Sequence, residues 1–268
     1  MAKKKIVILD GARPDDRHLD PILTILTDVL LRKHHKSRVQ TFKLRKIKLN
    51  PCIGCFHCFI KTPGRCLHSD AGADILQAIL HCDEVFFFTP VVFGGYSSEL
   101  KKMVDRFLPL ALPFFHKVHG ETHHPPRYTA FPRFVGIGVQ SRPQKKQADC
   151  FKILVGRNAV NFYPSSYAAE VVDSTASPEI LRSRFQALLS RTDELPLGRE
   201  LTLLSEHAVS AQKISTGNHR VLLIVGSQKI RQPNTSAVLG GHLLNRLKQH
   251  GWKTKSLTLR KNLLYGRE

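Results

Sequence analysis

The chain has 268 residues, 42% of them hydrophobic, so it can build a globular core and disorder of the whole chain is excluded. Its 41 Lys and Arg against 21 Asp and Glu give a net charge of +20, which attracts anionic partners without choosing among them. A secretory signal is not expected after the basic start, and the longest apolar stretches are too short to span a membrane. We therefore expect a reducing, cytoplasmic setting, in which clustered cysteines bind metal or do redox chemistry more often than they form disulfides.

Apolar strands alternate with amphipathic helices from residue 6 to residue 190. A buried strand at 6–9 precedes a helix in which Asp20 is the expected N-cap and Pro21 the first helical residue. Further strands are predicted at 38–44, 85–89, 134–139 and 168–172, and further helices at 74–81, 98–108, 144–155 and 178–190. This order predicts an α/β fold with a doubly wound, five-stranded parallel sheet, whose ligands bind at the carboxyl ends of the strands.

Four cysteines follow the second predicted strand in a C-x2-C-x2-C-x7-C array: Cys52, Cys55, Cys58 and Cys66. A [4Fe–4S] cluster needs one thiolate per iron, and the two-residue gaps let one turning loop present three of them. A structural zinc site is the first alternative, although such sites usually take pairs of ligands from two separated loops. A set of four thiols without metal is the second alternative.

Residues 89–94 read Thr-Pro-Val-Val-Phe-Gly and follow the third predicted strand. Downstream positions extend the motif with Ser97, Ser98, Leu100, Lys101, Asp105 and Arg106. With the cysteine array before it, this segment resembles the flavodoxin-like NAD(P)H-dependent FMN reductases, in particular their iron–sulfur flavoprotein branch. The resemblance extends over roughly residues 4–191.

The resemblance implies that FMN contacts the loops after the third and fourth strands, at Thr89, Pro90, Val91, Phe93, Gly94, Gly95 and Gly138. Pro90 fixes the first loop, and glycines allow its backbone to approach a flat heterocycle, on which Phe93 or Tyr96 can pack. Thr89 and the Gly94-Gly95 backbone are the candidates for hydrogen bonds to the flavin ring. In a parallel sheet the Thr89 and Gly138 loops are expected to be neighbours. An ordinary strand-to-helix turn is the alternative.

The loop after the first strand departs from the family pattern. The family usually carries hydroxyl side chains there, which hold the FMN phosphate together with helix N-terminal amides. In this chain, residues 11–20 contain no Ser or Thr and carry Asp15, Asp16 and Asp20, whose carboxylates would repel a phosphate. Arg13 and Arg17 are the candidates to compensate for that repulsion.

A family-like phosphate loop occurs near the end of the chain instead. Residues 221–225 read as a strand, and a loop and helix follow with Ser227, Arg231, Asn234, Thr235 and Ser236 as candidate phosphate contacts. Aligned without gaps, Gly11 matches Gly226 and Lys33 matches Lys248, which indicates the start of a second flavodoxin-like unit. The expected organisation is a cysteine-containing domain at 1–193, a linker at 194–219 and a partial second unit at 220–268.

A strand–helix–strand unit cannot bury both faces of its sheet alone. Three arrangements remain open: the natural protein continues, the fragment adds to the first sheet, or it docks on another protomer. A degenerate repeat kept for packing is the alternative to a working phosphate loop.

The functional hypothesis is an FMN-dependent oxidoreductase or electron-transfer protein with an adjacent [4Fe–4S] cluster. Flavin chemistry belongs to the cofactor, so no catalytic side chain is expected. Expected partners are NAD(P)H or a small redox protein and further copies of the chain, with no membrane and no nucleic acid. One alternative is a cluster-free NAD(P)H-dependent FMN or quinone reductase. Another is a cofactor-poor flavodoxin-like protein that binds an anionic partner.

Overall fold

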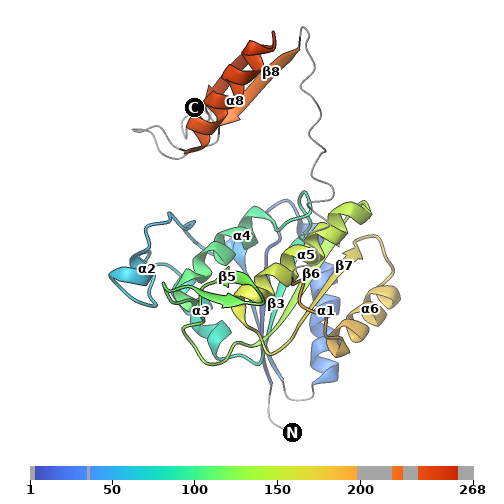
Figure 1. Cartoon of the computed structure of the whole chain (residues 1–268). Helices are drawn as coiled ribbons and strands as arrows, with labels where there is room; N and C mark the ends of the chain where they lie inside the picture. Colours follow the sequence, from blue (N-terminus) through green and yellow to red (C-terminus); the bar gives the residue numbers. More distant parts are fainter. Residues whose placement is uncertain (1–3, 35–36, 198–218, 226–234, 259–268) are drawn as a thin grey trace. The chain divides into compact units, whose positions relative to one another are not determined.

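The computed structural model describes residues 4–34, 37–197, 219–225 and 235–258, and it divides into two units, 1–202 and 203–268 (Figure 1). Three predicted phosphate contacts, Ser227, Arg231 and Asn234, lie outside the described residues. Most of the predicted linker at 194–219 lies outside them as well. None of the described helices is long and apolar enough to cross a membrane.

The first unit is built on a five-stranded parallel sheet, as predicted, and its strands lie in the order β2-β1-β3-β6-β7 (Figure 1). Its strands are β1 (Lys5–Asp10), β2 (Arg38–Lys43), β3 (Glu84–Pro90), β6 (Arg133–Gln140) and β7 (Tyr167–Asp173). The central strand β3 is buried along its whole length, because helices cover both faces of the sheet.

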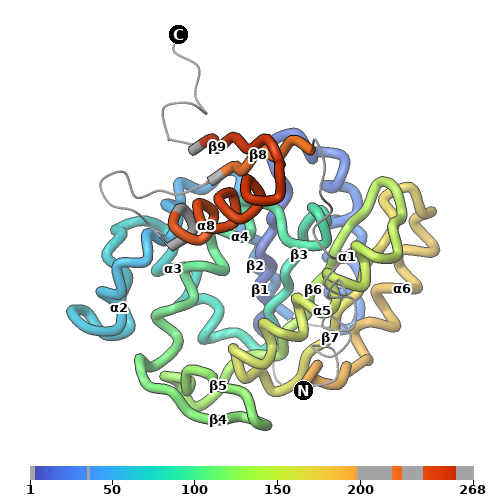
Figure 2. The backbone as a smooth tube through the Cα atoms, turned by 45° about the horizontal axis from the view of Figure 1, so that its top comes forward, coloured from blue at the N-terminus to red at the C-terminus, as the bar shows by residue number. Residues whose placement is uncertain are grey.

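Two hydrophobic clusters fill the space between the sheet and its helices. On one face, Ile6 and Ile8 pack with α1 (Asp20–Lys33) and α6 (Pro178–Ser190). On the other face, Val7 and Leu9 pack with α3 (Gly72–Leu80), α4 (Ser98–Val104) and α5 (Lys145–Phe162). Figure 2 shows α1 and α6 on one side of the strands and α3 and α4 on the other. The alternation along β1 follows from the two-residue period of a strand.

Several elements differ in detail from the prediction. The predicted helix at 98–108 ends as an α-helix at Val104 and continues as the 3-10 helix η3 (Asp105–Leu110), which contains Pro109. A proline ring clashes with the carbonyl four residues earlier, here that of Asp105, so α-helical bonding stops there. Asp20 is the first residue of α1 and not its N-cap, and its carboxylate pairs with Lys43 and Arg45 instead.

Short elements that the periodicity did not reveal complete the first unit. They are the 3-10 helices η1 (Arg17–Leu19) and η2 (Leu44–Lys46), the one-turn helix α2 (His57–Ile60) and the hairpin strands β4 (His116–Val118) and β5 (Glu121–His123). All of them are three or four residues long, too short to show a hydrophobic period.

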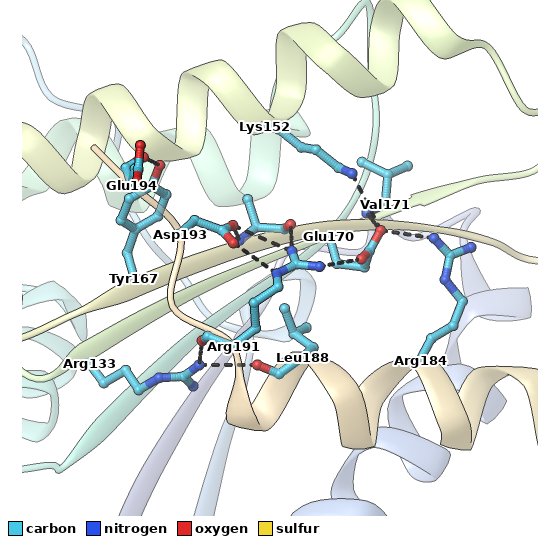
Figure 3. Close-up of polar contacts among 11 residues, drawn as sticks. Arg133, Lys152, Tyr167, Glu170, Val171, Arg184, Leu188, Arg191, Asp193 and Glu194 are labelled. Atoms are coloured by element: carbon cyan, nitrogen blue, oxygen red, sulfur yellow. Dashed lines mark hydrogen bonds and ion pairs between the residues drawn. The ribbon is translucent and has the colours of Figure 1, made fainter. Parts of the chain in front are cut away.

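The segment after α6 returns along the edge strand β7 (Figure 3). Asp193 donates its amide to the Tyr167 carbonyl at 2.8 Å and accepts the Ala169 amide at 2.8 Å. Glu170, on β7, pairs with Arg184 at 2.9 Å and with Arg191 at 3.0 Å. Burial alone would raise the pKa of Glu170, but the Val171 amide and these cations lower it. These contacts use backbone groups of Tyr167 and Ala169 that an edge strand would otherwise offer to another strand.

The second unit repeats the first strand–helix–strand segment. It consists of β8 (Arg220–Val225), α8 (Thr235–Gln249) and β9 (Lys253–Thr258). Lys5 pairs with Arg38 in the first unit, and Arg220, 215 positions after Lys5, pairs in parallel with Lys253, 215 positions after Arg38. The ungapped alignment therefore holds at the level of strand register.

The sheet of the second unit is packed closely on one face. Gly240 of α8 lies so near Leu223 of β8 that a Cβ at this glycine would approach the leucine side chain to 2.5 Å. Leu244 and Leu247 of the same helix are buried. Leu222 and Ile224, which alternate with Leu223 along β8, are more than half exposed within the described residues. The unit thus buries one sheet face and leaves apolar side chains on the other.

Candidate functional site

The carboxyl ends of β1, β3 and β6 meet at one edge of the sheet. Asp10 pairs with Phe88, and Thr89 pairs with Gly138, which confirms that the two predicted loops are neighbours. Beyond these strand ends lies a cavity of about 260 Å³. Its walls include Arg13, Asp16, Pro90, Val91, Gln140 and Arg142. Crevices at this position are where open α/β sheets bind their ligands.

The loop after β3 forms a tight turn from Val92 to Gly95. The Val92 amide donates to the Gly95 carbonyl at 3.0 Å, and the Gly95 amide donates to the Val92 carbonyl at 2.8 Å. The two central residues, Phe93 and Gly94, have φ angles of +50° and +76°, as a type I′ turn requires. Phe93 is 95% exposed at the tip. The turn therefore presents an aromatic ring to solvent, while Pro90 and Val91 form part of the cavity wall.

Thr89 and Tyr96 use their polar groups inside the protein. Thr89 is fully buried, and its hydroxyl donates to the Pro90 carbonyl at 3.1 Å and accepts the Ser97 amide at 3.1 Å. The buried hydroxyl of Tyr96 accepts from Asn158 Nδ2 at 2.7 Å, and burial raises the pKa of this tyrosine. These contacts assign both residues to bracing the loop. Phe93 remains the aromatic candidate for a flavin ring.

Gly138 brings the loops after β3 and β6 together. A Cβ at this position would come within 2.6 Å of Val91 Cγ2 and 3.0 Å of the Phe151 ring, so only glycine leaves room for both side chains. The Val91 amide donates to the carbonyl of Val139 at 2.9 Å, which extends the pairing of β3 and β6 into the loop. Gly138 therefore affects the cavity indirectly, because it leaves room for the wall residue Val91.

The carboxylates of the loop after β1 are all paired within the protein, except for the exposed Asp15. Asp16 forms an ion pair with Arg13 at 2.7 Å. Asp20 accepts from Arg45 at 2.6 Å, and the same guanidinium reaches the buried Asp10 at 3.1 Å. Burial raises the pKa of Asp10, although the Ala12 amide and Arg45 oppose that effect. The negative charges predicted to repel a phosphate are thus largely compensated by cations.

The four predicted metal ligands follow β2 in one loop, in which Cys58 is buried and Cys55 is exposed. Burial raises the pKa of the Cys58 thiol, and the charges of Cys66, Cys52 and Cys55 raise it further. The thiols are therefore close enough to influence one another. Among the described residues, no group of three or more His, Cys, Asp or Glu side chains is arranged to hold a metal ion. Four thiols are the ligand type that an iron–sulfur cluster needs, but in this structure they are not arranged around a metal position.

Arg106 joins the two ends of the cysteine loop. Its guanidinium donates to the Asn50 carbonyl at 2.9 Å and to both carboxylate oxygens of Asp70, at 2.9 and 3.0 Å. Asp70 also accepts the amides of Asn50 and Gly72. The Arg106 Nε is buried without a hydrogen-bond partner. Burial opposes the charge of Arg106, but its contacts with Asp70 and Cys66 raise its pKa. A permanent positive charge therefore lies beside the thiols.

A second cavity, of about 500 Å³, adjoins the cysteine loop. Cys52 and Gly54 line it together with aromatic side chains, among them Phe107 of η3 and Phe162 at the end of α5. The cavity beyond the strand ends instead reaches Gln147, in the first turn of α5. Helix α5 is about 27 Å long at 1.5 Å per residue, and it lines the cavity at the strand ends near its first turn and the second cavity near its last turn. The expected adjacency of flavin and cluster stays a prediction.

The remaining predicted phosphate contacts, Thr235 and Ser236, are the first two residues of α8. Their side chains lie outside the described set. The structure adds cavity residues that the sequence analysis did not select, in particular Arg142, Gln144 and Gln147. The available signal was their place after the fourth predicted strand, Arg142 in the loop and Gln144 and Gln147 at the start of the next predicted helix, because ligands bind beyond strand ends.

Residues 5–123 match the sequence model of the NADPH-dependent FMN reductase family. Among curated proteins, an iron-sulfur flavoprotein of Methanocaldococcus jannaschii is 42% identical over 113 residues, which are 41% of this chain and 55% of that protein. An iron-sulfur flavoprotein of Archaeoglobus fulgidus is 27% identical over 86 residues, 31% of this chain and 38% of that protein. The chain thus spans about half the length or less of these relatives.

Solved structures share the fold of the first unit. An NAD(P)H:quinone oxidoreductase from Methanothermobacter marburgensis has a TM-score of 0.54 and 13% identity, covering 72% of this chain and 99% of that one. An azoreductase from Bacillus anthracis has a TM-score of 0.51 and 14% identity, covering 69% of this chain and 100% of that one. At these identities the likeness concerns the fold alone.

Proposed function

We propose that the chain is a flavin-dependent oxidoreductase with NAD(P)H as its electron donor, because residues 5–123 match the sequence model of the NADPH-dependent FMN reductase family. The observation that carries the proposal is the cavity beyond the ends of β1, β3 and β6, where the family motif forms the wall. When bound there, a flavin supplies the redox chemistry, since it accepts a hydride and passes on electrons. The protein binds and orients it.

The residues at this edge fit the ring end of a flavin. Pro90 and Val91 supply an apolar wall, the exposed Phe93 lies on the adjacent turn, and Gln140 adds an amide that can exchange hydrogen bonds with a heterocycle. The Gln140 side chain accepts the Gln144 amide at 3.2 Å, which fixes its orientation. The loop after β1 does not offer a comparable set of donors for the phosphate.

We assign Cys52, Cys55, Cys58 and Cys66 as ligands of a [4Fe–4S] cluster. Support comes from the four neighbouring thiols and from the names of the curated relatives, which are iron-sulfur flavoproteins. The contact of Arg106 with Cys66 raises the pKa of the guanidinium, so this side chain supplies a cation next to one of the proposed ligands. Binding of iron requires a rearrangement of the cysteine loop, because the described side chains are not arranged to hold a metal ion.

A visible spectrum of the anaerobically purified full chain, combined with flavin, iron and sulfide assays, tests both assignments. Bound flavin together with about four irons per chain supports the complete proposal. Flavin without iron indicates a cluster-free reductase, and absence of both refutes an oxidoreductase. A Cys55→Ser variant that keeps its full iron content refutes the ligand set, and Cys150→Ser is the matched control because this exposed cysteine lies outside the loop.

A further inference from the structure

A carboxylate of the protein itself occupies the position where the loop after β1 faces the cavity. Asp16 is only 5% exposed and forms part of the cavity wall. Its Oδ2 accepts the Arg13 amide at 2.9 Å and Arg13 Nε at 2.7 Å, while its Oδ1 accepts Arg13 Nη2 at 3.0 Å. A backbone amide and a two-pronged guanidinium are the donors that a phosphate group normally attracts.

The preceding amides of the loop are also engaged. The Gly11 amide donates to the Phe88 carbonyl at 2.7 Å, and the Ala12 amide donates to Asp10 Oδ1 at 2.9 Å. Three successive amides, at residues 11 to 13, are therefore used by acceptors of the protein. Residues 11–20 contain no hydroxyl side chain that could replace them.

We propose that Asp16 is an internal anion at the phosphate position of this unit, so that the cavity binds a flavin through its ring and ribityl chain and gains no affinity from the phosphate. The inference rests on the proposed flavin site. It makes Asp16 a specificity-determining residue, which sets the preference between flavins with and without a phosphate group.

The ionisation of Asp16 agrees with this role. The hydrogen bond from Arg13 holds the pKa of Asp16 below its usual range, so the carboxylate is charged at neutral pH. A phosphate entering here would meet a like charge whose partner cation is already paired. His18 and Arg142 also line the cavity, and a phosphate held by them would produce a preference for FMN in the unaltered protein.

The test compares the unaltered full chain with Asp16→Ser and Asp15→Ser. Asp15 is exposed and adjacent, so its replacement changes the net charge equally without opening the position. We expect FMN and riboflavin to bind the unaltered chain and Asp15→Ser with affinities within about threefold of each other. Asp16→Ser should prefer FMN by about tenfold or more, with riboflavin affinity unchanged. A tenfold preference for FMN in the unaltered chain, or equal shifts in both variants, overturns the inference.

Inorganic phosphate gives a second measurement that does not depend on flavin binding. We expect phosphate, compared with chloride at equal ionic strength, to raise the thermal midpoint of Asp16→Ser but not that of the unaltered chain or Asp15→Ser. If none of the proteins binds a flavin, the proposed function fails, and the phosphate series still decides the role of Asp16. Should Asp16→Ser not fold, Asp16→Asn removes the charge with little change in shape. The preference for FMN and the effect of phosphate on the thermal midpoint are then expected in the same direction but smaller. Phosphate effects that are equal in all variants overturn the inference.

Discussion

Replacing Arg106 by Met tests whether this residue holds the cysteine loop together. The Arg106 side chain is 1% exposed and its partner Asp70 is 5% exposed, so the substitution leaves a buried carboxylate without its cation. Three guanidinium hydrogen bonds, to Asp70 and to the Asn50 carbonyl, are lost at the same time. Removing one partner of a buried ion pair costs about 3–5 kcal/mol. At about 2–4 °C per kcal/mol for a unit of this size, the thermal midpoint should fall by about 6–20 °C.

Urea unfolding of Arg106→Met measures this cost, and Lys101→Met is its matched control. Lys101 pairs with Asp105 in the same helical segment, but both side chains are about half exposed, so its loss should cost less than about 1 kcal/mol. Limited trypsin digestion gives a local measurement, since Lys61 and Arg65 are exposed sites within the cysteine loop and should be cut faster in Arg106→Met. A loss of stability no larger than that of Lys101→Met, with unchanged cleavage, would refute the reasoning.

Three further outcomes are expected. Gly94→Ala should destabilise the unit by about 1–2 kcal/mol in urea unfolding, because φ is +76° there and the new Cβ would lie 2.7 Å from Cys150 Cβ. Iodoacetamide at pH 8 should label Cys150 much faster than Cys82 by peptide mass mapping, since burial raises the pKa of Cys82 to about 12. Hydrogen bonds from Arg157, and then from His123, lower the pKa of Glu121 to about 2. Its stabilising effect is thus present above about pH 4.3 and is lost as the pH falls toward 2. In Glu121→Gln the urea midpoint should therefore depend less on pH over this range than in the unaltered chain.

The sheet was predictable because its signals are local. The five apolar runs, each followed by a helix, predict a parallel doubly wound sheet, and the structure has a five-stranded parallel sheet. The repeat was predictable for the same reason: matching positions in the two segments have matching apolar patterns, and the strand registers of β1–β2 and β8–β9 coincide. Local patterns also identified the loop at 89–95, since proline and glycine restrict the backbone by themselves.

The partners of individual side chains were not predictable, because they depend on residues far apart in the chain. Arg106 is separated from Asp70 by 36 positions, and Arg45 from Asp10 by 35. Burial decides the roles of such groups, and burial of a polar side chain has no periodic signal. Thr89 illustrates the point: the motif suggests a ligand contact, whereas the fold uses the hydroxyl to join Pro90 to Ser97.

The two copies of the strand–helix–strand segment differ most in the loop between the first strand and the helix. Their strands keep the same register because each strand must pack against the helix of its own unit. The loops between strand and helix are free of that constraint. The first loop contains Arg13 and Asp16, an anion and its cation in one turn, while the equivalent positions of the second loop are Gln228 and Arg231, followed by Asn234, Thr235 and Ser236. The first loop supplies its own anion, so no phosphate is needed to balance Arg13. The second loop has a cation, amide side chains and two hydroxyls, which can donate hydrogen bonds to a bound phosphate. The first loop thus pairs its cation with an anion of its own, while the composition of the second suits an external phosphate.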